Sequence, residues 1–433
     1  MGEWAAVAYP SAMAVATQSV TDLCRAAKAA ARELAALDSA AKDRALLAVA
    51  DALEARTPEI LEANARDLDA GRESGLSDAL MDRLALDERR VAAMARGVRD
   101  IVALPDPVGE VIDGSRFANG LQMRKVRVPL GVVAVVYEAR PNVTIDAAAL
   151  CLKSGNAIVL RGSSSAAHSN AVLAAVAREA AEANGLPAGA LALVAGGGRE
   201  ELAELAGQEG LVDLIIPRGS EGLKQALAAV AKVPVIYAAS GNCHVYVDAS
   251  ADLDAARAIV LNAKTQRPGV CNAAETLLVH GGVVDRFLPD VLHALDDAGV
   301  ELRGDERVRA AAGGVPVAEA SEDDYAEEFL ALILAVKVVD SVEDAIEHIN
   351  AYGSGHSEAI VTGSVTASRA FQLGVDAACV YTNASTRFTD GGEFGMGAEI
   401  GNSTQKLHAR GPIGLRELCT FKYLVEGTGH IRP

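Results

Sequence analysis

The chain has 433 residues, of which 50% are apolar and only 4% aromatic, and its formal net charge is −18. Such an acidic chain lacks the basic face typical of nucleic-acid binding, and its length suits about two or three domains. Neither a signal-peptide pattern nor a membrane-length apolar run is present. Six cysteines are spread thinly, without the spacing of a zinc site or a disulfide framework. We therefore expect a cytoplasmic α/β protein with free thiols and no metal, and no contact with nucleic acid or membrane.

The first third of the chain predicts helices followed by a β-arm. Apolar residues recur at helical spacing from 20 to 102, and Pro105 and Pro107 end this region. Residues 108–128 alternate in polarity around a turn at 113–115, which predicts a two-stranded arm. Because such an arm is barely stable alone, we expect it to pack on another element or another subunit.

Two α/β regions follow. In the first, from residue 131 to 248, the predicted strands are 132–137, 157–160, 191–194, 214–216 and 235–237, and the predicted helices are 144–153, 169–184, 200–208 and 221–230. This alternation predicts a parallel sheet flanked by helices. In the second, which begins near Asp252, the predicted helices are 253–264, 283–298 and 342–350, and the predicted strands are 276–280, 332–338, 358–362 and 379–382. An acidic loop is expected at 319–328 and a glycine-rich loop at 391–401. The tail, residues 415–425, is expected to form a helical turn and a final strand.

Cys271 is the first candidate for chemistry. It follows Pro268-Gly269 in a loop between a predicted helix and a predicted strand, where a thiol can be exposed. A nucleophilic cysteine acts as the thiolate and needs a positive neighbourhood, which Arg267 and Lys264 could provide. The alternative is that Cys271 is simply a small apolar residue.

Asn142 lies in the turn between a buried strand and a helix. Ligands of parallel sheets gather beyond the carboxyl ends of the strands, so this turn is expected to face the site. The amide of Asn142 could donate to an oxyanion. The alternative is that Asn142 caps the helix that follows.

Two further turns leave the same predicted sheet edge. Arg161 and Ser163 combine a cation with hydroxyl groups that could hold the 2′-phosphate of NADP, although an ordinary solvated turn fits equally well. In the segment Arg218-Gly219-Ser220, the glycine would let a ligand approach the backbone. The alternative there is a helix entry capped by Ser220.

These motifs together resemble the aldehyde dehydrogenase superfamily, and within it the glutamate-5-semialdehyde dehydrogenase (γ-glutamyl phosphate reductase) branch. The resemblance extends from about residue 26 to the C-terminus. Its most specific segments are 128–142, 213–219, 241–248, 264–272, 383–395, 397–401 and 406–412.

The resemblance implies an architecture of two parallel-sheet α/β domains and a β-arm for oligomerisation. A Rossmann-like NADP-binding domain would comprise residues 1–107 and 129–249. A catalytic domain with the nucleophilic cysteine would comprise residues 250–406, and residues 108–128 and 407–433 would form the arm. A homo-oligomer, either a dimer or a tetramer, is then expected. Contact with the upstream enzyme, glutamate 5-kinase, is a further hypothesis, motivated by the lability of acyl phosphates.

The resemblance also implies roles for individual residues. Cys271 falls on the nucleophile of the family and Asn142 on its oxyanion-hole amide. Arg161 falls where relatives contact the adenosine ribose, and Glu328 resembles the glutamate that holds the nicotinamide ribose. The resulting candidates for binding NADP(H) are Arg161, Ser163, Arg218, Gly219, Ser220 and Glu328.

The implied reaction is the NADPH-dependent reduction of L-glutamate 5-phosphate to L-glutamate 5-semialdehyde, the second step of proline biosynthesis from glutamate. It would proceed reversibly through a thioester on Cys271, with release of phosphate. Because the substrate is anionic, Arg140, Arg267 and Arg387 are candidate cations, with Ser385 and Thr386 as hydroxyl donors. Each arginine could instead form a structural ion pair.

Two other interpretations remain. Hydrolytic aldehyde dehydrogenases carry a glutamate base in the segment that here comprises residues 237–241, where no carboxylate is present. This absence disfavours a hydrolytic NAD(P)-dependent aldehyde dehydrogenase. The other alternative is a non-catalytic member of the family, which the presence of Cys271 and Asn142 disfavours.

Overall fold

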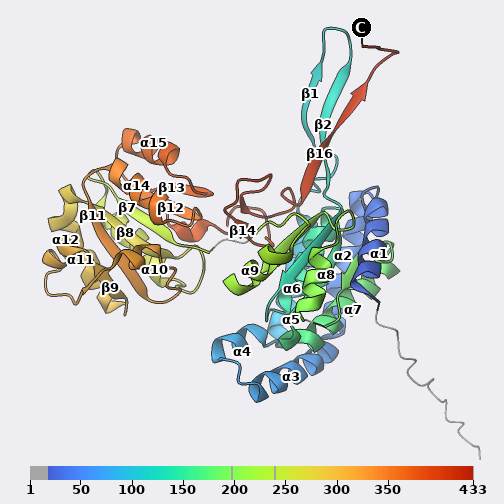
Figure 1. The fold of residues 1–433 in the computed structure, drawn as a ribbon, viewed down its shortest axis with the longest axis horizontal. Helices are drawn as coiled ribbons and strands as arrows, with labels where there is room; N and C mark the ends of the chain where they lie inside the picture. Colours follow the sequence, from blue (N-terminus) through green and yellow to red (C-terminus); the bar gives the residue numbers. More distant parts are fainter. Residues whose placement is uncertain (1–17, 197, 238–239, 433) are drawn as a thin grey trace, which may run out of the picture.

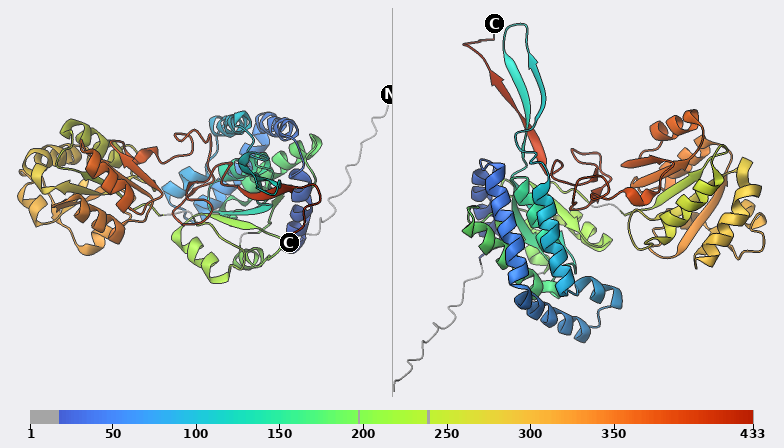
Figure 2. Two further views of the ribbon diagram at one scale, coloured as in Figure 1. Left: turned by 90° about the horizontal axis from the view of Figure 1, so that it is seen from above. Right: turned by 180° about the vertical axis from the view of Figure 1, so that it is seen from behind.

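The computed structural model describes residues 18–196, 198–237 and 240–432. Two α/β lobes lie side by side, and a long β-arm projects from the first of them, with the C-terminus near its tip (Figures 1 and 2). The predicted α/β class with two parallel sheets is confirmed. Among the described residues, no helix has both the length and the apolar character needed to cross a membrane.

The first lobe begins with the predicted helical region. Its helices are α1 (Val20–Leu34), α2 (Ser39–Ala55), α3 (Thr57–Glu73), α4 (Asp78–Leu84) and α5 (Glu88–Ala103). Short polar side chains start four of them: Ser19, Asp38, Ser77 and Asp87 each accept a hydrogen bond from a backbone N–H of the first turn.

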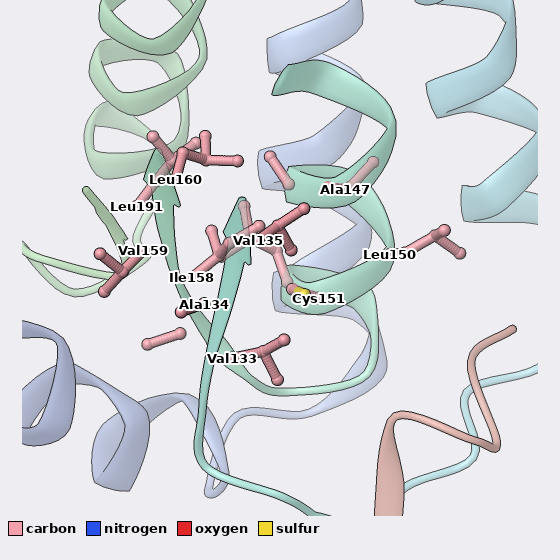
Figure 3. Close-up of a cluster of buried hydrophobic side chains, with 14 of the residues drawn as sticks. Val133, Ala134, Val135, Ala147, Leu150, Cys151, Ile158, Val159, Leu160 and Leu191 are labelled. Atoms are coloured by element: carbon pink, nitrogen blue, oxygen red, sulfur yellow. The ribbon is translucent and has the colours of Figure 1, made fainter. Parts of the chain in front are cut away.

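The sheet of the first lobe is parallel, with the order β5-β4-β3-β6. Its strands are β3 (Val132–Tyr137), β4 (Ala157–Arg161), β5 (Leu191–Leu193) and β6 (Leu214–Arg218). The helices between and after them are α6 (Asn142–Lys153), the 3-10 helix η1 (Ser164–Ala166), α7 (Ala167–Ala183), α8 (Arg199–Ala206) and α9 (Glu221–Val230). Every residue of β3 and β4 is buried, as expected for strands that helices cover on both faces. Figure 3 shows side chains of these strands packing against α6, with Val135 close to Cys151 and Ala147.

The predicted strand at 235–237 is wrong. Val235 forms only an isolated parallel bridge with Ile215. The amide of Ile236 still donates to the Ile215 carbonyl, but the ladder goes no further, because the next amide, that of Tyr237, donates to the side-chain oxygen of Gln405.

The sheet of the second lobe is parallel as well, with the order β10-β9-β11-β8-β7-β12-β13. Its strands are β7 (Cys243–Val247), β8 (Ala274–His280), β9 (Glu301–Gly304), β10 (Ala318–Glu319), β11 (Ile333–Val339), β12 (Ser357–Val361) and β13 (Cys379–Thr382). The helices are α10 (Leu253–Thr265), η2 (Gly281–Val283), α11 (Val284–Asp297), α12 (Glu306–Ala310), α13 (Glu322–Ala326), α14 (Val342–Tyr352), α15 (Val365–Gly374) and η3 (Thr386–Phe388). Alternate residues of β7 enter two cores, Val245 and Val247 on one face and Tyr246 on the other.

Three expectations for this lobe need correction. Strand β7 belongs to the second sheet, so a domain boundary at residue 249 lies one strand too late in the chain. The acidic segment 319–328 is not all loop, because Ser321 and Asp324 form a capping box that starts α13. Strand β9 and helices α12 and α15 were not predicted.

The arm is a three-stranded antiparallel sheet of β1 (Val111–Arg116), β2 (Gln122–Pro129) and β16 (Cys419–Glu426), in the order β1-β2-β16. The predicted turn at 113–115 instead lies inside β1. The chain reverses between Phe117 and Leu121, where Gly120 adopts a φ of 95°. Before β16, the hairpin of β14 (Asn402–Ser403) and β15 (Gly411–Pro412) returns the chain to the first lobe, where Ile413 and Leu418 join its core.

Candidate active site

The three predicted ligand turns meet at one edge of the first sheet. Register places Arg161 beside Val136 and Arg218 beside Tyr137, at the carboxyl ends of three parallel strands. The turn that leads to Asn142 follows Tyr137 directly. The edge therefore gathers Asn142, Arg161 and Arg218, as expected for the carboxyl ends of neighbouring parallel strands.

Asn142 does not cap its helix. It is the first residue of α6, and the N-cap is Pro141, which provides no side-chain hydrogen bond. The Nδ2 atom of Asn142 donates to Oδ2 of Asp146, one turn further along, at 2.9 Å. Asn142 is exposed at the strand edge. The capping interpretation is thus wrong, and the amide stays available to a ligand through its second hydrogen.

Cys271 lies in the turn between α10 and β8 and is partly exposed, whereas the other five cysteines are buried. Three bonds hold this turn. The Cys243 thiol donates to the Cys271 carbonyl at 3.2 Å, the Asn272 amide donates to the Thr389 carbonyl at 2.9 Å, and Thr386 Oγ1 donates to the Asn272 carbonyl at 2.7 Å. The thiol is therefore presented by a turn that strand β7 and the loop around η3 hold in place.

Gly241 closes one side of the Cys271 turn. A Cβ atom there would lie 1.4 Å from the carbonyl oxygen of Cys271, so only glycine permits this approach. The amide of Gly241 donates to Glu328 Oε1 at 2.6 Å. Glu328 is thus brought next to the cysteine turn, although this oxygen already accepts a backbone hydrogen bond.

Charges from both lobes act on the Cys271 thiol. Burial raises its pKa, and the carboxylates of Glu399 and Glu328 add to this, while Arg218 and the N–H of Cys271 itself lower it. Lys264, expected from its sequence position to help, instead pairs with Glu275 at 2.5 Å, and both side chains are fully buried. The cation with the largest effect in favour of the thiolate is therefore Arg218, from the end of β6 in the first lobe.

Arginines from both lobes gather around Cys271. Burial lowers the pKa of Arg140, and Arg218, Arg83 and Arg267 lower it further, while Cys271 raises it. Burial and Arg267 likewise lower the pKa of Arg387, and Cys271 again acts in the opposite direction. Within the described part of the chain, Arg140, Arg267 and Arg387 form no ion pair with a carboxylate; Arg387 donates to Gln266 Oε1 at 2.7 Å. A cluster with such mutual repulsion is suited to an anionic ligand.

The two hydroxyl candidates differ from expectation. Thr386 is fully buried, and its hydroxyl hydrogen is used by the Asn272 carbonyl, so Thr386 supports the cysteine turn rather than offering a donor. Ser385 Oγ accepts a hydrogen bond from the Arg387 amide at 3.3 Å and starts η3.

The cofactor candidates surround an anion-accepting turn. The amide and hydroxyl of Ser220 donate to the carboxylate of Glu138 at 2.7 and 3.1 Å, so Ser220 does not cap α9 through its side chain. A Cβ atom at Gly219 would lie 2.6 Å from the Glu138 carboxylate and 2.7 Å from a methyl group of Leu223, so a larger residue there would displace both side chains. The Ser220 amide and hydroxyl thus hold a carboxylate, so the turn after β6 is able to accept an anionic group.

The second cofactor turn is tightly folded. Arg161 donates to the Gly198 carbonyl at 2.7 Å and is largely buried. Ser163 Oγ lies 2.6 Å from Ser165 Oγ and accepts a hydrogen bond from the Ala139 amide at 3.2 Å. Arginine and hydroxyl groups at this position fit a phosphorylated ribose.

Four residues near the site were missed by the sequence reasoning: Arg83, Glu138, Asp146 and Glu399. Asp146 could have been found, because it lies four residues after Asn142 on one helix face. Arg83 and Glu399 carry no local signal, since the tertiary fold brings them near. Residues 238 and 239, in the segment 237–241 where no carboxylate base is present, lie outside the described residues. Residues 1–17 of the predicted first domain lie outside them as well. No group of three or more His, Cys, Asp or Glu that could hold a metal occurs in the part of the chain that the structure describes.

Comparisons with known proteins show the family to which the chain belongs. A family model described as "Aldehyde dehydrogenase family" matches residues 8–312. A gamma-glutamyl phosphate reductase of Thermobifida fusca (strain YX) is 56% identical over 415 residues, 96% of this chain and 99% of the relative. One from Moorella thermoacetica is 58% identical over 407 residues, 94% of this chain and 97% of the relative.

Solved structures show the same likeness. The crystal structure of gamma-glutamyl phosphate reductase from Thermotoga maritima has a TM-score of 0.94 and 45% sequence identity, and the match covers 96% of this chain and all of that chain. The chain therefore belongs to the aldehyde dehydrogenase family and, within it, to the gamma-glutamyl phosphate reductases.

Proposed function

We propose that the protein reduces L-glutamate 5-phosphate to L-glutamate 5-semialdehyde with NADPH and releases phosphate, as the second step of proline biosynthesis from glutamate. The observation that carries this proposal is the arginine cluster around the one partly exposed cysteine among the described residues. An acyl phosphate needs both features, a thiolate for its carbon and cations for its charge. The names of the relatives support the same substrate.

The reaction begins with attack of the Cys271 thiolate on the acyl carbon. The negative charge that develops on the carbonyl oxygen is stabilised by the Asn142 amide and the backbone N–H of Cys271. Arginines of the cluster neutralise the departing phosphate, and a thioester remains on Cys271. The nicotinamide cofactor, when bound, supplies a hydride that reduces the thioester. The same two donors hold the oxygen in the second tetrahedral state, which collapses to the aldehyde and frees Cys271.

Within this proposal, the cofactor candidates have distinct tasks. Arg161 and Ser163 would hold the 2′-phosphate that distinguishes NADP from NAD. Gly219 and Ser220 would contact the phosphates that bridge the two nucleotides, and Glu328 the nicotinamide ribose. Arg218 was first expected to bind the cofactor as well, but its effect on Cys271 favours a role at the thiolate.

The residues that would bind the substrate are proposed from the negative charge of its carboxylate and phosphate groups. Arg140, Arg267 and Arg387 would divide the α-carboxylate and phosphate between them, and Ser385 would add a hydroxyl hydrogen. Thr386 would act only through the cysteine turn. Arg83 of α4 extends this cluster from the first lobe.

The arm supports a homo-oligomer. Phe421, Tyr423 and Val425 are exposed, and they alternate along β16, so they share one face of a ribbon that has no helix on it. A second copy of the chain would bury this face. A dimer or tetramer satisfies this requirement, and the cytoplasm suits the partly exposed nucleophilic thiol.

The reverse reaction gives the test. Purified protein receives glutamate-5-semialdehyde and NADP, with and without inorganic phosphate, and NADPH formation is followed by absorbance. We expect activity that requires phosphate and that Cys271→Ala abolishes, while Cys24→Ala, which changes a buried cysteine of α1, retains it. Equal activity without phosphate would show that water resolves the thioester and would favour the hydrolytic alternative. Inactivity of the wild type with every cofactor would favour a non-catalytic protein.

A further inference from the structure

The strongest unexplained contact near the site joins Asn142 to Asp146. Asn142 Nδ2 lies 2.9 Å from Asp146 Oδ2, and the two residues are four positions apart on α6. We propose that Asp146 is a positioning residue that orients the Asn142 amide, so that its second N–H faces the carbonyl oxygen under attack. This inference rests on the proposed role of Asn142 as an oxyanion donor.

The chemistry of the two groups explains why a carboxylate is suited to this task. An ionised carboxylate only accepts hydrogen bonds, so it selects the nitrogen of the amide and rejects its oxygen. One hydrogen of Nδ2 is then used by Asp146, and the other remains for a ligand. If the amide rotated by half a turn, its oxygen would meet the developing oxyanion and repel it.

The fold keeps Asp146 in place. Its neighbours Ile145 and Ala147 are buried in the core of the first lobe, which fixes this turn of α6 against the sheet. Arg218 is the charged residue that acts on Asp146, and it also acts on Cys271. Asp146 thus lies in the same electrostatic environment as the nucleophile.

The ionisation of Asp146 agrees with this role. Burial raises its pKa to about 6, against the opposing effects of the Asn142 hydrogen bond and Arg218. The carboxylate is therefore charged at neutral pH and loses its charge on acidification through about pH 6. A protonated Asp146 could donate to the amide oxygen and would no longer dictate the orientation.

The test uses the full-length protein and the aldehyde-oxidation assay with saturating phosphate. Asp146→Asn keeps the size of the side chain, but it can either donate or accept, so it leaves the amide of Asn142 free to rotate. We expect kcat to fall by roughly 10- to 100-fold, somewhat less than the loss of a complete oxyanion donor, with KM changed by less than about twofold. Asp100→Asn, an exposed aspartate of α5, is the matched control and should behave as wild type.

Two further measurements separate positioning from a structural role. In the wild type kcat should decline below about pH 6, and this acidic limb should disappear in Asp146→Asn. In an Asn142→Ala background, Asp146→Asn should cause no additional loss, because the amide that it orients is gone. An additive loss, or a kcat within twofold of wild type for Asp146→Asn, would overturn the proposal.

The design also keeps this inference separate from the proposed reaction. Oxidation of the aldehyde passes through an oxyanion at Cys271 whether phosphate or water resolves the thioester. A phosphate-independent enzyme in which Asp146→Asn still lowers kcat would contradict the proposed reaction and support the positioning role. If Asn142→Ala kept full activity, the oxyanion role and this inference would both fail, while phosphate dependence would stand.

Discussion

At the scale of single residues, the charges that act on Cys271 could be predicted only in part from its neighbours in the chain. Lys264 and Arg267 are close in sequence, yet Lys264 is paired with Glu275, and the cation with the largest effect on the pKa of Cys271 is Arg218. Proximity along a chain is a weak guide to a pKa, since a charge acts through space over a few ångströms.

Replacement of Arg218 tests this environment. Arg218→Met removes the cation that lowers the pKa of Cys271, so the thiol should need a higher pH to ionise. We expect the midpoint of iodoacetamide alkylation of Cys271 to move upward by roughly one pH unit. Because alkylation needs neither substrate nor cofactor, it separates this effect from any role of Arg218 in binding. Arg178→Met, an exposed position on α7, serves as the control, and an unchanged midpoint in Arg218→Met would contradict the assignment.

At the scale of elements, α10 and β8 are joined beneath the cysteine turn. Lys264 is the last buried residue of α10 and Glu275 is the second residue of β8, and the two form a fully buried pair on either side of Cys271. Burial raises the pKa of Glu275 to about 7, and Lys264 opposes this. The pair is therefore expected to align the two elements rather than to add much net stability.

Replacing only Lys264 of the buried pair should destabilise the fold more than replacing both Lys264 and Glu275. Lys264→Met leaves Glu275 buried without a counter-charge and should destabilise the fold by about 3–5 kcal/mol, whereas Lys264→Met with Glu275→Leu should cost less. Without Lys264 the pKa of Glu275 in the folded protein rises further. Above about pH 7, Glu275 then stays protonated in the folded variant but is ionised in the unfolded chain, so the loss of stability should increase with pH. Urea denaturation at pH 6 and pH 9 measures both effects. Arg25→Met, which breaks an exposed pair with Asp22, should change little, and equal costs for the single and double variants would refute the expectation.

At the scale of the whole molecule, the arm is the part that the single chain leaves incomplete. Phe421 and Tyr423 contact each other edge to face, with ring centroids 5.8 Å apart, yet both remain about half exposed. Lys125 lies over the Phe421 ring at 3.7 Å. A three-stranded ribbon with an exposed aromatic face is expected to find a partner surface.

Polar substitution of that face should reduce the molecular mass in solution. The double variant Phe421→Ser with Tyr423→Ser removes most of the apolar area that association would bury, so size-exclusion chromatography with light scattering should show a smaller species. Lys422→Ser alters the same strand on its opposite face and should leave the mass unchanged. If the double variant kept the mass of the wild type, another surface would hold the oligomer together.

The sequence by itself was enough for the elements whose signal is local. A fully buried strand such as β3 appears as an uninterrupted apolar run, and its helix follows at regular spacing. Helix α15 was not predicted because Phe371 is its one buried residue, so the helix has almost no apolar stripe to detect. Strand β9 was not predicted for a similar reason, since Leu302 is the single large apolar side chain among its four residues and the strand owes its conformation to pairing with β11.

Cys271 and Asn142 could be proposed as candidates from their turns, while their roles as nucleophile and oxyanion donor came from the resemblance to the family. What only the tertiary structure decided is which groups face them. Strand β7 joins the second sheet through β8 and β12, pairings that involve residues up to 114 positions apart. Arg218 reaches Cys271 from the other lobe, and Glu138 reaches Ser220 across 82 positions. Such contacts depend on the order of the strands and on how the two lobes pack. A local pattern of residues carries no information about either, so only the tertiary structure showed which charges act on the site.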